Sequence, residues 1–251
     1  GGRLKVEETV YTGHEAGNTT TYWYDWQNRL VEQNNPDGGT LKWTYRKDGL
    51  LESETDAMSQ TTYYRYDALK NQTGAWMPCA SGTYTYQGMT YDREGNLLTR
   101  TQGVTAVAKD TIPTERITLT YTYDVLGRRT SVTDGNGTVT TYVYDKDNRC
   151  IREETVVSDT QTGLITYTYN HLSEPATMSV YAEPESFGNS TGAELVEVNG
   201  KTFVKLTTSY EYDKEGRLTK ETAPDGTETT YGYDSVGNCV EITVTGKAIK
   251  N

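Results

Sequence analysis

The sequence is poor in the residues that fill most protein cores. Leucine, isoleucine, valine and phenylalanine number 15, 6, 18 and 2, about 16% of the 251 residues, a share at which disorder is suspected. The 21 tyrosines and 4 tryptophans argue the other way, because each ring can bury a flat body and keep a polar tip in water. These aromatic residues recur at a fixed spacing, which a disordered chain has no reason to show.

A positive charge and a long apolar run are also missing. The net charge is −11 and the pI is about 4.8, which argues against nucleic acid and anionic membrane surfaces as partners. No stretch approaches the roughly 18 to 20 apolar residues of a membrane span. No charged-then-apolar leader opens the chain, although a signal could have been removed.

Cysteine and histidine are scarce. Cys79, Cys150 and Cys239 make an odd number without paired-ligand spacing, so neither a disulfide framework nor a zinc site is indicated. His14 and His171 lie far apart and outside any nucleophile motif. We predict no catalytic residue, no cofactor and no metal.

What recurs instead is the tetrapeptide Tyr-x-Tyr-Asp, shortened to Tyr-Asp in one copy. The copies that keep the motif contain Tyr22, Tyr24, Asp25; Tyr64, Tyr66, Asp67; Tyr91, Asp92; Tyr121, Tyr123, Asp124; Tyr142, Tyr144, Asp145; Tyr210, Tyr212, Asp213; and Tyr231, Tyr233, Asp234. Two decayed copies end at Arg46 and Asn170. The shortest and commonest interval between fourth positions is 21 residues, so we take 21 as the base period.

Two turn signals alternate within each unit. In Asp-x-x-Gly, the aspartate caps its own backbone and the glycine takes the left-handed conformation that ends a type I turn with a bulge. These glycines are Gly95, Gly127, Gly216 and Gly237. Pro224, Asp225 and Gly226 form a second hairpin signal of similar build, and residues 36–38 and 134–137 occupy the same place in other units.

The runs between turns are rich in threonine, tyrosine, valine and isoleucine, and they alternate as strands do. Tyr-x-Tyr therefore places both rings on one side of a strand. We expect equivalent tyrosines to line up or interleave across the sheet as cross-strand pairs. No segment shows a 3.6-residue period. The predicted fold is all-β: an antiparallel β-meander of about 21-residue repeats, a single array over residues 1–251 that forms a curved or spiralling sheet.

Longer intervals mark interruptions of the meander. Residues 104–115 are expected to form a long loop. Residues 171–209 are predicted to be an insertion with an extra hairpin, in which 194–198 and 201–207 flank a type I′ turn at Asn199 and Gly200, and 183–191 read as exposed loop. Both ends of the chain match the middle of a unit, so we expect a portion of a longer array with unpaired terminal strands.

The repeat register also interprets two cysteines. Cys150 and Cys239 lie five residues after the motif aspartate, where other units have Leu30, Leu97 and Leu218. We therefore expect both thiols to be packed and inert, as free cysteine commonly is. Cys79 lies beside Pro78 in an irregular stretch.

Three kinds of chemistry compete with this structural interpretation. The aspartates could supply a carboxylate pair for glycoside hydrolysis, but they recur with the turns, which favours turn capping. Residues 134–137 resemble part of a calcium loop but lack its full ligand pattern. The aromatic rows could stack on sugars, in which case the candidates are those tryptophans that face solvent among Trp23, Trp26, Trp43 and Trp76.

The string Tyr-Asp-x-x-Gly-Arg-Leu at 212–218, followed by Pro-Asp-Gly-Thr and Tyr-x-Tyr-Asp, resembles the YD repeats of the Rhs family. That family includes bacterial polymorphic toxins, wall-associated proteins, shell subunits of insecticidal toxin complexes and teneurins. The resemblance implies a β-sheet that spirals into a hollow shell, which encloses a C-terminal toxic domain in the toxin members. No family-like self-cleavage sequence or variable toxin domain follows the last repeat, so neither enclosure nor autoproteolysis is assigned to this chain.

We therefore expect a scaffold segment, not an enzyme, in a secreted or surface-displayed protein. Its partners would be the adjoining repeats, a C-terminal toxin domain or a surface glycan. The alternative is an adhesion or carbohydrate-binding module on the cell surface.

Overall fold

The structure is a computed structural model that describes residues 4–12, 15–79, 82–157, 162–184 and 194–246. Twenty strands occupy these ranges, the strands pair antiparallel, and the ranges contain no α-helix. The sequence-based prediction of an all-β antiparallel meander is confirmed. No helix in the described ranges is long and apolar enough to cross a membrane.

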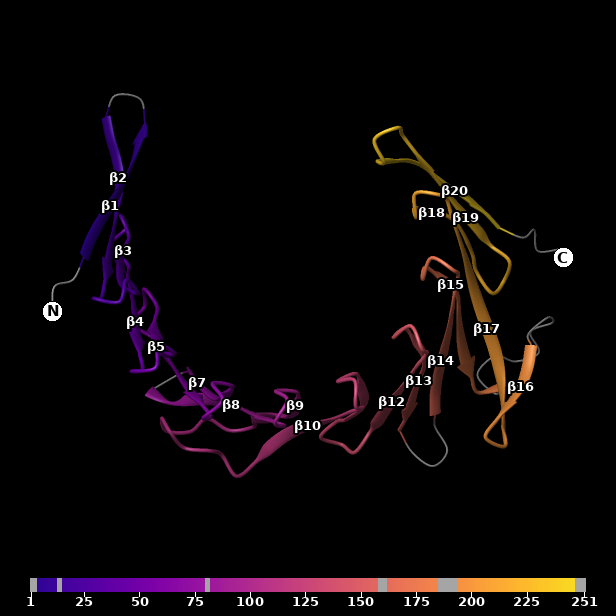
Figure 1. Cartoon of the computed structure of the whole chain (residues 1–251), viewed down its shortest axis with the longest axis horizontal. Coiled ribbons are helices and arrows are strands. Elements are labelled where there is room, and N and C mark those ends of the chain that lie inside the picture. The colour runs from indigo at the N-terminus through magenta and orange to yellow at the C-terminus, as the bar shows by residue number, and fades with distance from the viewer. Residues whose placement is uncertain (1–3, 13–14, 80–81, 158–161, 185–193, 247–251) are drawn as a thin grey trace. The chain divides into compact units, whose positions relative to one another are not determined.

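The chain comprises two compact units, residues 1–121 and 122–251 (Figure 1). In the first, each strand pairs with its sequence neighbours. Its strands are β1 (Leu4–Thr12), β2 (Glu15–Tyr24), β3 (Leu30–Asn34), β4 (Thr40–Tyr45), β5 (Leu51–Thr55), β6 (Thr61–Tyr66), β7 (Gln72–Pro78), β8 (Tyr84–Tyr91), β9 (Leu97–Gly103) and β10 (Arg116–Tyr123), within which the boundary falls.

The second unit continues the same pattern with one exception. Its strands are β11 (Arg129–Thr133), β12 (Val139–Tyr144), β13 (Cys150–Val156), β14 (Thr162–Tyr169), β15 (Pro175–Ala182), β16 (Glu194–Val198), β17 (Lys201–Tyr212), β18 (Leu218–Thr222), β19 (Glu228–Tyr233) and β20 (Cys239–Thr245). Strand β17 pairs with β15 directly, and β16 is an addition paired with the start of β17. The extra hairpin therefore leaves the main ladder continuous.

The turn after β17 shows why these residues form hairpins. The amide of Asp213 donates to the carbonyl of Arg217, and the amide of Gly216 donates to the carbonyl of Asp213, both at 3.0 Å. Gly216 has φ = 80°, and the ladder register skips one residue between Glu211 and Tyr212. The Asp213 carboxylate accepts the amides of residues 215 and 217. This is the predicted bulged type I turn.

The same backbone pattern recurs at both kinds of turn. The left-handed position is occupied by glycine at 38, 49, 95, 127, 137, 216, 226 and 237, and by Asn28, Ser59, Lys70, Asn148 and Ser173 elsewhere. In the extra hairpin, Asn199 and Gly200 have φ values of 51° and 78°, as a type I′ turn requires. The hairpin geometry is as predicted, whereas the domain bounds 171–209 stay a prediction.

The tyrosine doublets do not face one another across the sheet. In β12 the two tyrosines are half-buried and Val143 between them is exposed. However, Tyr142 lies opposite Glu153 and Tyr144 opposite Cys150. Each repeat contributes two strands, so an intervening strand separates equivalent tyrosines, and the expected direct pairing between them is wrong.

The core is thin and lies in two places. The buried hydrophobic residues of the described ranges are Ala75, Trp76, Tyr86, Leu164, Phe203 and Val204. The first three lie in β7 and β8 of the first unit, and the others lie in β14 and β17 of the second. Most strand residues are half-buried, because a single-layer sheet covers neither face completely.

The two cysteines that were predicted to be packed differ in burial. Cys150 is half-buried and its thiol contacts the carbonyl of Arg152 at 3.5 Å. Cys239 is exposed, and the expectation that it is packed is wrong. It begins β20, which is exposed along its whole length because β19 is its partner on one side and no described strand covers the other. All three thiols are free.

The loop at 104–115 folds back onto the first unit. Val107 forms a two-way backbone bridge with Tyr84, and the indole N–H of Trp76 donates to the carbonyl of Thr111 at 2.8 Å. Of the expected exposed loop at 183–191, residues 185–191 lie outside the described residues.

Candidate functional site

A recurring contact set joins each repeat to the next. The Nε of Arg217 donates to Asp213 Oδ2 at 2.7 Å, and the same guanidinium lies 4.8 Å from the ring centre of Tyr233. The hydroxyl of Tyr233 in turn donates to the carbonyl of Leu218 at 2.8 Å. We call this Asp–Arg–Tyr set the repeat clasp. It reaches over β18 from the turn after β17 to the end of β19.

Four copies of the repeat clasp occur in the described residues. They are Asp25–Arg29–Tyr45, Asp124–Arg128–Tyr144, Asp145–Arg149–Tyr169 and Asp213–Arg217–Tyr233. In the first three, the guanidinium also donates to the backbone carbonyl at the fourth motif position of the next repeat. Each arginine therefore ties together two consecutive motif turns.

Asparagine replaces arginine in three other repeats. Asn71, Asn96 and Asn238 donate side-chain amides to the motif aspartates at 67, 92 and 234. The amide closes the turn, but it is too short to reach the next repeat. These repeats keep the turn cap but have no arginine at this position.

The repeat clasp also sets the charge state of its aspartates. The amide of Arg149, followed by the side chain of that arginine, lowers the pKa of Asp145, against the opposing effect of burial. The same two groups of Arg217 lower the pKa of Asp213. Each motif aspartate is therefore held as a carboxylate by donors of its own turn, whereas a general acid requires a raised pKa.

The sequence pattern predicted roles for the tyrosine, aspartate and glycine of the motif, but the arginine entered only as part of the family string and was given no role. The structure places the motif aspartates singly, one in each turn, and does not bring two together as a hydrolytic pair. The missed signal was the arginine four residues after the aspartate, which recurs in four repeats as regularly as the glycine.

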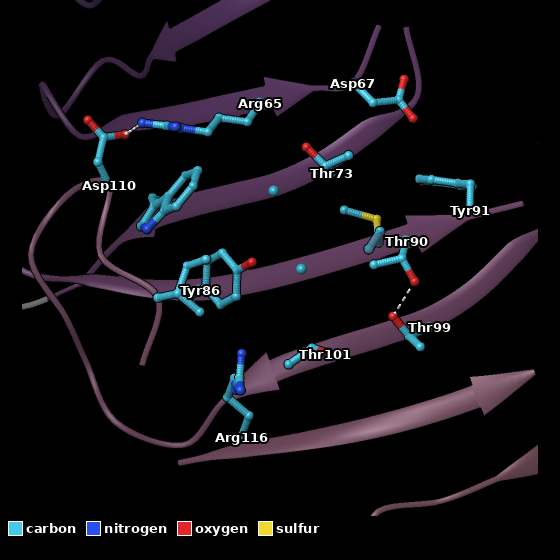
Figure 2. A pocket seen from close by; sticks show the side chains of 15 residues that line it. Arg65, Asp67, Thr73, Tyr86, Thr90, Tyr91, Thr99, Thr101, Asp110 and Arg116 are labelled. Atoms are coloured by element: carbon cyan, nitrogen blue, oxygen red, sulfur yellow. Dashed lines mark hydrogen bonds and ion pairs between the residues drawn. The ribbon is translucent and has the colours of Figure 1, made fainter. Parts of the chain in front are cut away.

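The second feature is an open groove over β6–β10, with a volume of about 550 Å³ (Figure 2). Gly74 and Gly88 lie opposite each other at its floor. A Cβ on Gly74 would lie 3.1 Å from the Trp76 ring, and one on Gly88 would lie 2.5 Å from the Tyr86 hydroxyl. The two rings therefore lean along their own strands over glycines that leave them space.

The rims of the groove carry charge. Arg65 forms an ion pair with Asp110 of the loop at 2.9 Å, and its guanidinium lies 5.3 Å from the ring centre of Trp76. In Figure 2, Arg116 lies on the opposite side of Tyr86 from Arg65. Among the described residues, the groove is lined by no histidine, cysteine or lysine, and no cluster of three metal-ligating side chains occurs in them. The groove offers surface contacts and threonine hydroxyls and holds no nucleophile–base pair.

The tryptophans suspected of sugar stacking lie in different surroundings. Trp76 is 2% exposed beneath the loop, so its faces are unavailable. Trp23 and Trp43 are half-buried. Trp26 is 76% exposed at a turn. It is therefore the one of these four tryptophans that faces solvent, as sugar stacking requires. The turn at 134–137 has the ordinary capped geometry, His171 is exposed on a turn, and His14 lies outside the described residues.

Comparisons with known proteins agree on the repeat. The RHS Repeat family model matches residues 112–139, 123–158, 189–228 and 212–248. The chain is 28% identical over 217 residues to the tRNA nuclease WapA of Bacillus subtilis, and 28% identical over 220 residues to the tRNA3(Ser)-specific nuclease WapA of Bacillus spizizenii. Each alignment covers 79% of this chain but only 8% of the relative, so the chain spans a small part of the relatives it matches.

Solved structures share the fold. The crystal structure of TcdB2-TccC3-Cdc42 has a TM-score of 0.52 at 13% identity, over 96% of this chain and 15% of that chain. A Tc holotoxin pore of Photorhabdus luminescens has a TM-score of 0.51 at 14% identity, over 98% of this chain and 15% of that chain. Residues 112–158 and 189–248 therefore match the RHS repeat, and the chain shares the antiparallel fold of these solved structures.

Proposed function

We propose that this chain is a structural wall segment of a larger, secreted or surface-displayed Rhs protein, and that its sheet forms part of a shell around a C-terminal toxin domain. Two of its relatives are named as tRNA nucleases. The chain matches 8% of their length, and we assign the nuclease activity to a part of such a protein other than these repeats. The repeats would then serve as container, with the adjoining repeats as their partners.

One observation carries the proposal: the conspicuous side chains recur by register. An enzyme site is a single set of groups with matched pKa values. Here the same aspartate, arginine and tyrosine recur in four repeat clasps, with the aspartate pKa values lowered at each. Their contacts join one repeat to the next, so these side chains are engaged within the sheet.

The test is protease protection of the C-terminal domain in the complete polypeptide. We compare the natural protein with a variant that carries Arg128→Ala, Arg149→Ala and Arg217→Ala. The matched control is Arg93→Ala, an exposed turn arginine outside any repeat clasp. Loss of protection in the triple variant alone supports a wall role. Equal protection in all three proteins, or substrate turnover by the purified 251-residue chain, contradicts it.

A second candidate function is glycan adhesion, and one observation favours it. The Trp26 side chain is 76% exposed, and an exposed indole face can stack on the apolar face of a sugar ring. A glycan array probed with the chain, with Trp26→Ala and with the control Met58→Ala, tests this function. Binding that Trp26→Ala alone abolishes favours adhesion, whereas absence of binding leaves the wall role unopposed.

A further inference from the structure

The turns that follow the Tyr-x-Tyr strands differ from one repeat to the next in a regular way. In an antiparallel meander every second strand runs in the same direction, so within each unit these turns lie along one edge of the sheet. We call this edge the turn edge. Its exposed tips are residues 26–28, 47–49, 68–70 and 93–95 in the first unit, and 125–127, 146–148, 171–173, 214–216 and 235–237 in the second.

At their first two positions the tips alternate between apolar or uncharged residues and a pair of charged residues. Apolar side chains project at Trp26, Leu69, Val125 with Leu126, Leu172, and Val236. The tips between them carry a basic residue followed by an acidic one: Lys47–Asp48, Arg93–Glu94, Lys146–Asp147 and Lys214–Glu215. The pattern recurs with every second repeat. It is independent of the repeat clasps, because the arginine or asparagine that follows the tip occurs after both apolar and charged tips.

The apolar tips do not pack within the chain. Leu126, Leu172 and Val236 are 67%, 57% and 79% exposed. The middle positions of such turns favour polar residues and proline, so turn chemistry does not call for leucine or valine. Scattered exposed apolar residues are ordinary, but here they occupy every second tip of one edge, and this order is what the inference uses.

The alternation is regular along the edge of the sheet, even where the sequence interval between turns changes. Between Asn170 and Asp213 the chain is 43 residues long, because the β16 hairpin intervenes. Since β15 pairs directly with β17, the two turns are still one repeat apart on the edge, and the pattern continues from apolar Leu172 to charged Lys214. With strands about 4.8 Å apart and two strands per repeat, apolar tips recur roughly every 19 Å along the edge.

In the second unit the five tips read apolar, charged, apolar, charged, apolar, which is the same in both directions. A two-fold axis at Leu172 would bring this side chain against its own copy. It would also bring Val125 and Leu126 against Val236, and the 146–147 tip against the 214–215 tip. Because both charged tips run from basic to acidic, the reversal places Lys146 beside Glu215 and Asp147 beside Lys214.

We propose that the turn edge of the second unit is a self-complementary interface that binds the same edge of a second copy of this chain. A two-fold contact of this kind requires one patch to complement itself, and the palindromic order of apolar and charged tips meets that requirement. Within one chain, Asp147 contacts Arg149 at 3.3 Å and Glu215 contacts Arg217 at 3.5 Å. Lys214 also contacts Glu215 of its own tip at 3.6 Å, and in the two-fold contact it would exchange this neighbour for Asp147 of the second copy. The inference goes beyond the proposed wall role, because it assigns the edge a partner.

Sedimentation velocity of the purified chain over a range of concentrations tests the interface. We expect a reversible dimer. In a tip variant with Leu126→Ser, Leu172→Ser and Val236→Ser, the dimer dissociation constant rises about tenfold or more, because apolar contact area is lost. The matched control changes three equally exposed apolar residues away from this edge: Met58→Ser, Val104→Ser and Leu195→Ser. It dimerises as the natural chain does.

Charge reversal gives a second, independent arm. Lys146→Glu with Lys214→Glu makes both charged tips wholly acidic and weakens the dimer. Adding Asp147→Lys with Glu215→Lys restores the opposite charges across the axis and restores dimerisation. Two results overturn the proposal: a monomer at every concentration, or a dimer that survives the tip variant and is lost when the exposed edge strand β20 is changed by Val240→Lys and Ile242→Lys.

Discussion

The guanidinium of Arg217 lies 4.8 Å from the ring centre of Tyr233. Arg217 directly precedes β18, and Tyr233 ends the neighbouring strand β19. This contact couples the turn between β17 and β18 to β19, which carries the tyrosine of the following repeat. The ring of the motif tyrosine therefore contacts a cation in addition to packing on the sheet. Its hydroxyl, donating to Leu218 at 2.8 Å, fixes the ring beneath the arginine.

The first prediction concerns that hydroxyl. Tyr233→Phe keeps the ring and removes the bond to the Leu218 carbonyl, so the free energy of unfolding falls by about 1 kcal/mol. Urea denaturation of the purified chain measures the change. Tyr231→Phe is the control on the same strand, since its hydroxyl makes no hydrogen bond within the described part of the chain. Equal losses in the two variants would mean that the hydroxyl bond does not matter.

The second prediction concerns the turn backbone. Gly216 has φ = 80°, a conformation that a β-branched residue resists, so Gly216→Val lowers the free energy of unfolding by roughly 1 to 3 kcal/mol. Gly163 lies inside β14 with an ordinary φ, and its nearest neighbour would be 4.0 Å from an added Cβ. Gly163→Val is therefore tolerated. A Gly216→Val variant with an unchanged melting temperature would contradict the turn assignment.

The features that the sequence predicted well are local ones. The bulged turns depend on an aspartate and a left-handed residue three positions later, and the type I′ turn depends on Asn199 and Gly200 alone. Such signals act within four or five residues. They indicate where the chain reverses, and hence the fold class.

The features that the sequence missed depend on residues in different strands. Trp76 and Tyr86 come together only through the β7–β8 register, and the loop covers them through a carbonyl at Thr111. The arginine could not be placed over the tyrosine of the next repeat from the sequence, because the two side chains meet across an intervening strand. Cys239 had the right register for a packed residue, but burial also requires a neighbour on both sides of its strand.

The third prediction concerns a strained turn residue. Lys70 occupies the left-handed position with φ = 72°, where a residue with a Cβ is disfavoured by about 1 kcal/mol. Lys70→Gly relieves this cost, and the larger entropy of glycine in the unfolded chain offsets part of the gain. We expect the free energy of unfolding to rise by roughly 0.5 kcal/mol. Asn28→Gly is the control, because asparagine already tolerates this conformation; a larger gain there than at Lys70 would refute the strain argument.

The fourth prediction concerns acid. Eight turn aspartates have lowered pKa values: Asp25, Asp67, Asp92, Asp124, Asp145, Asp213, Asp225 and Asp234. A depressed native pKa contributes stability that is complete above the unfolded value of about 3.9 and is lost as the pH falls through the native value. The free energy of unfolding is therefore level from about pH 7 to 5 and declines steeply below about pH 4.

Urea denaturation at a series of pH values measures this decline. Asp213→Asn removes one of the titrating groups, so its acid decline is shallower than that of the natural chain, even though its stability at neutral pH is lower. A stability that is unchanged between pH 6 and pH 2.5 would show that the turn carboxylates make no net contribution.

The last prediction concerns the anchor of the 104–115 loop. Trp76 is 2% exposed, and its indole N–H holds the loop at the Thr111 carbonyl. Trp76→Phe keeps an aromatic ring in β7 but removes this donor, so the loop is released and protease cleavage between 104 and 115 accelerates while the strands stay intact. Trp76→Ala also removes the ring and costs roughly 3 to 5 kcal/mol. Trp43→Phe, a change on a half-buried strand residue away from the loop, leaves the cleavage pattern as it is. If Trp76→Phe were cleaved no faster than Trp43→Phe, the loop would be held by Val107 and Asp110 instead.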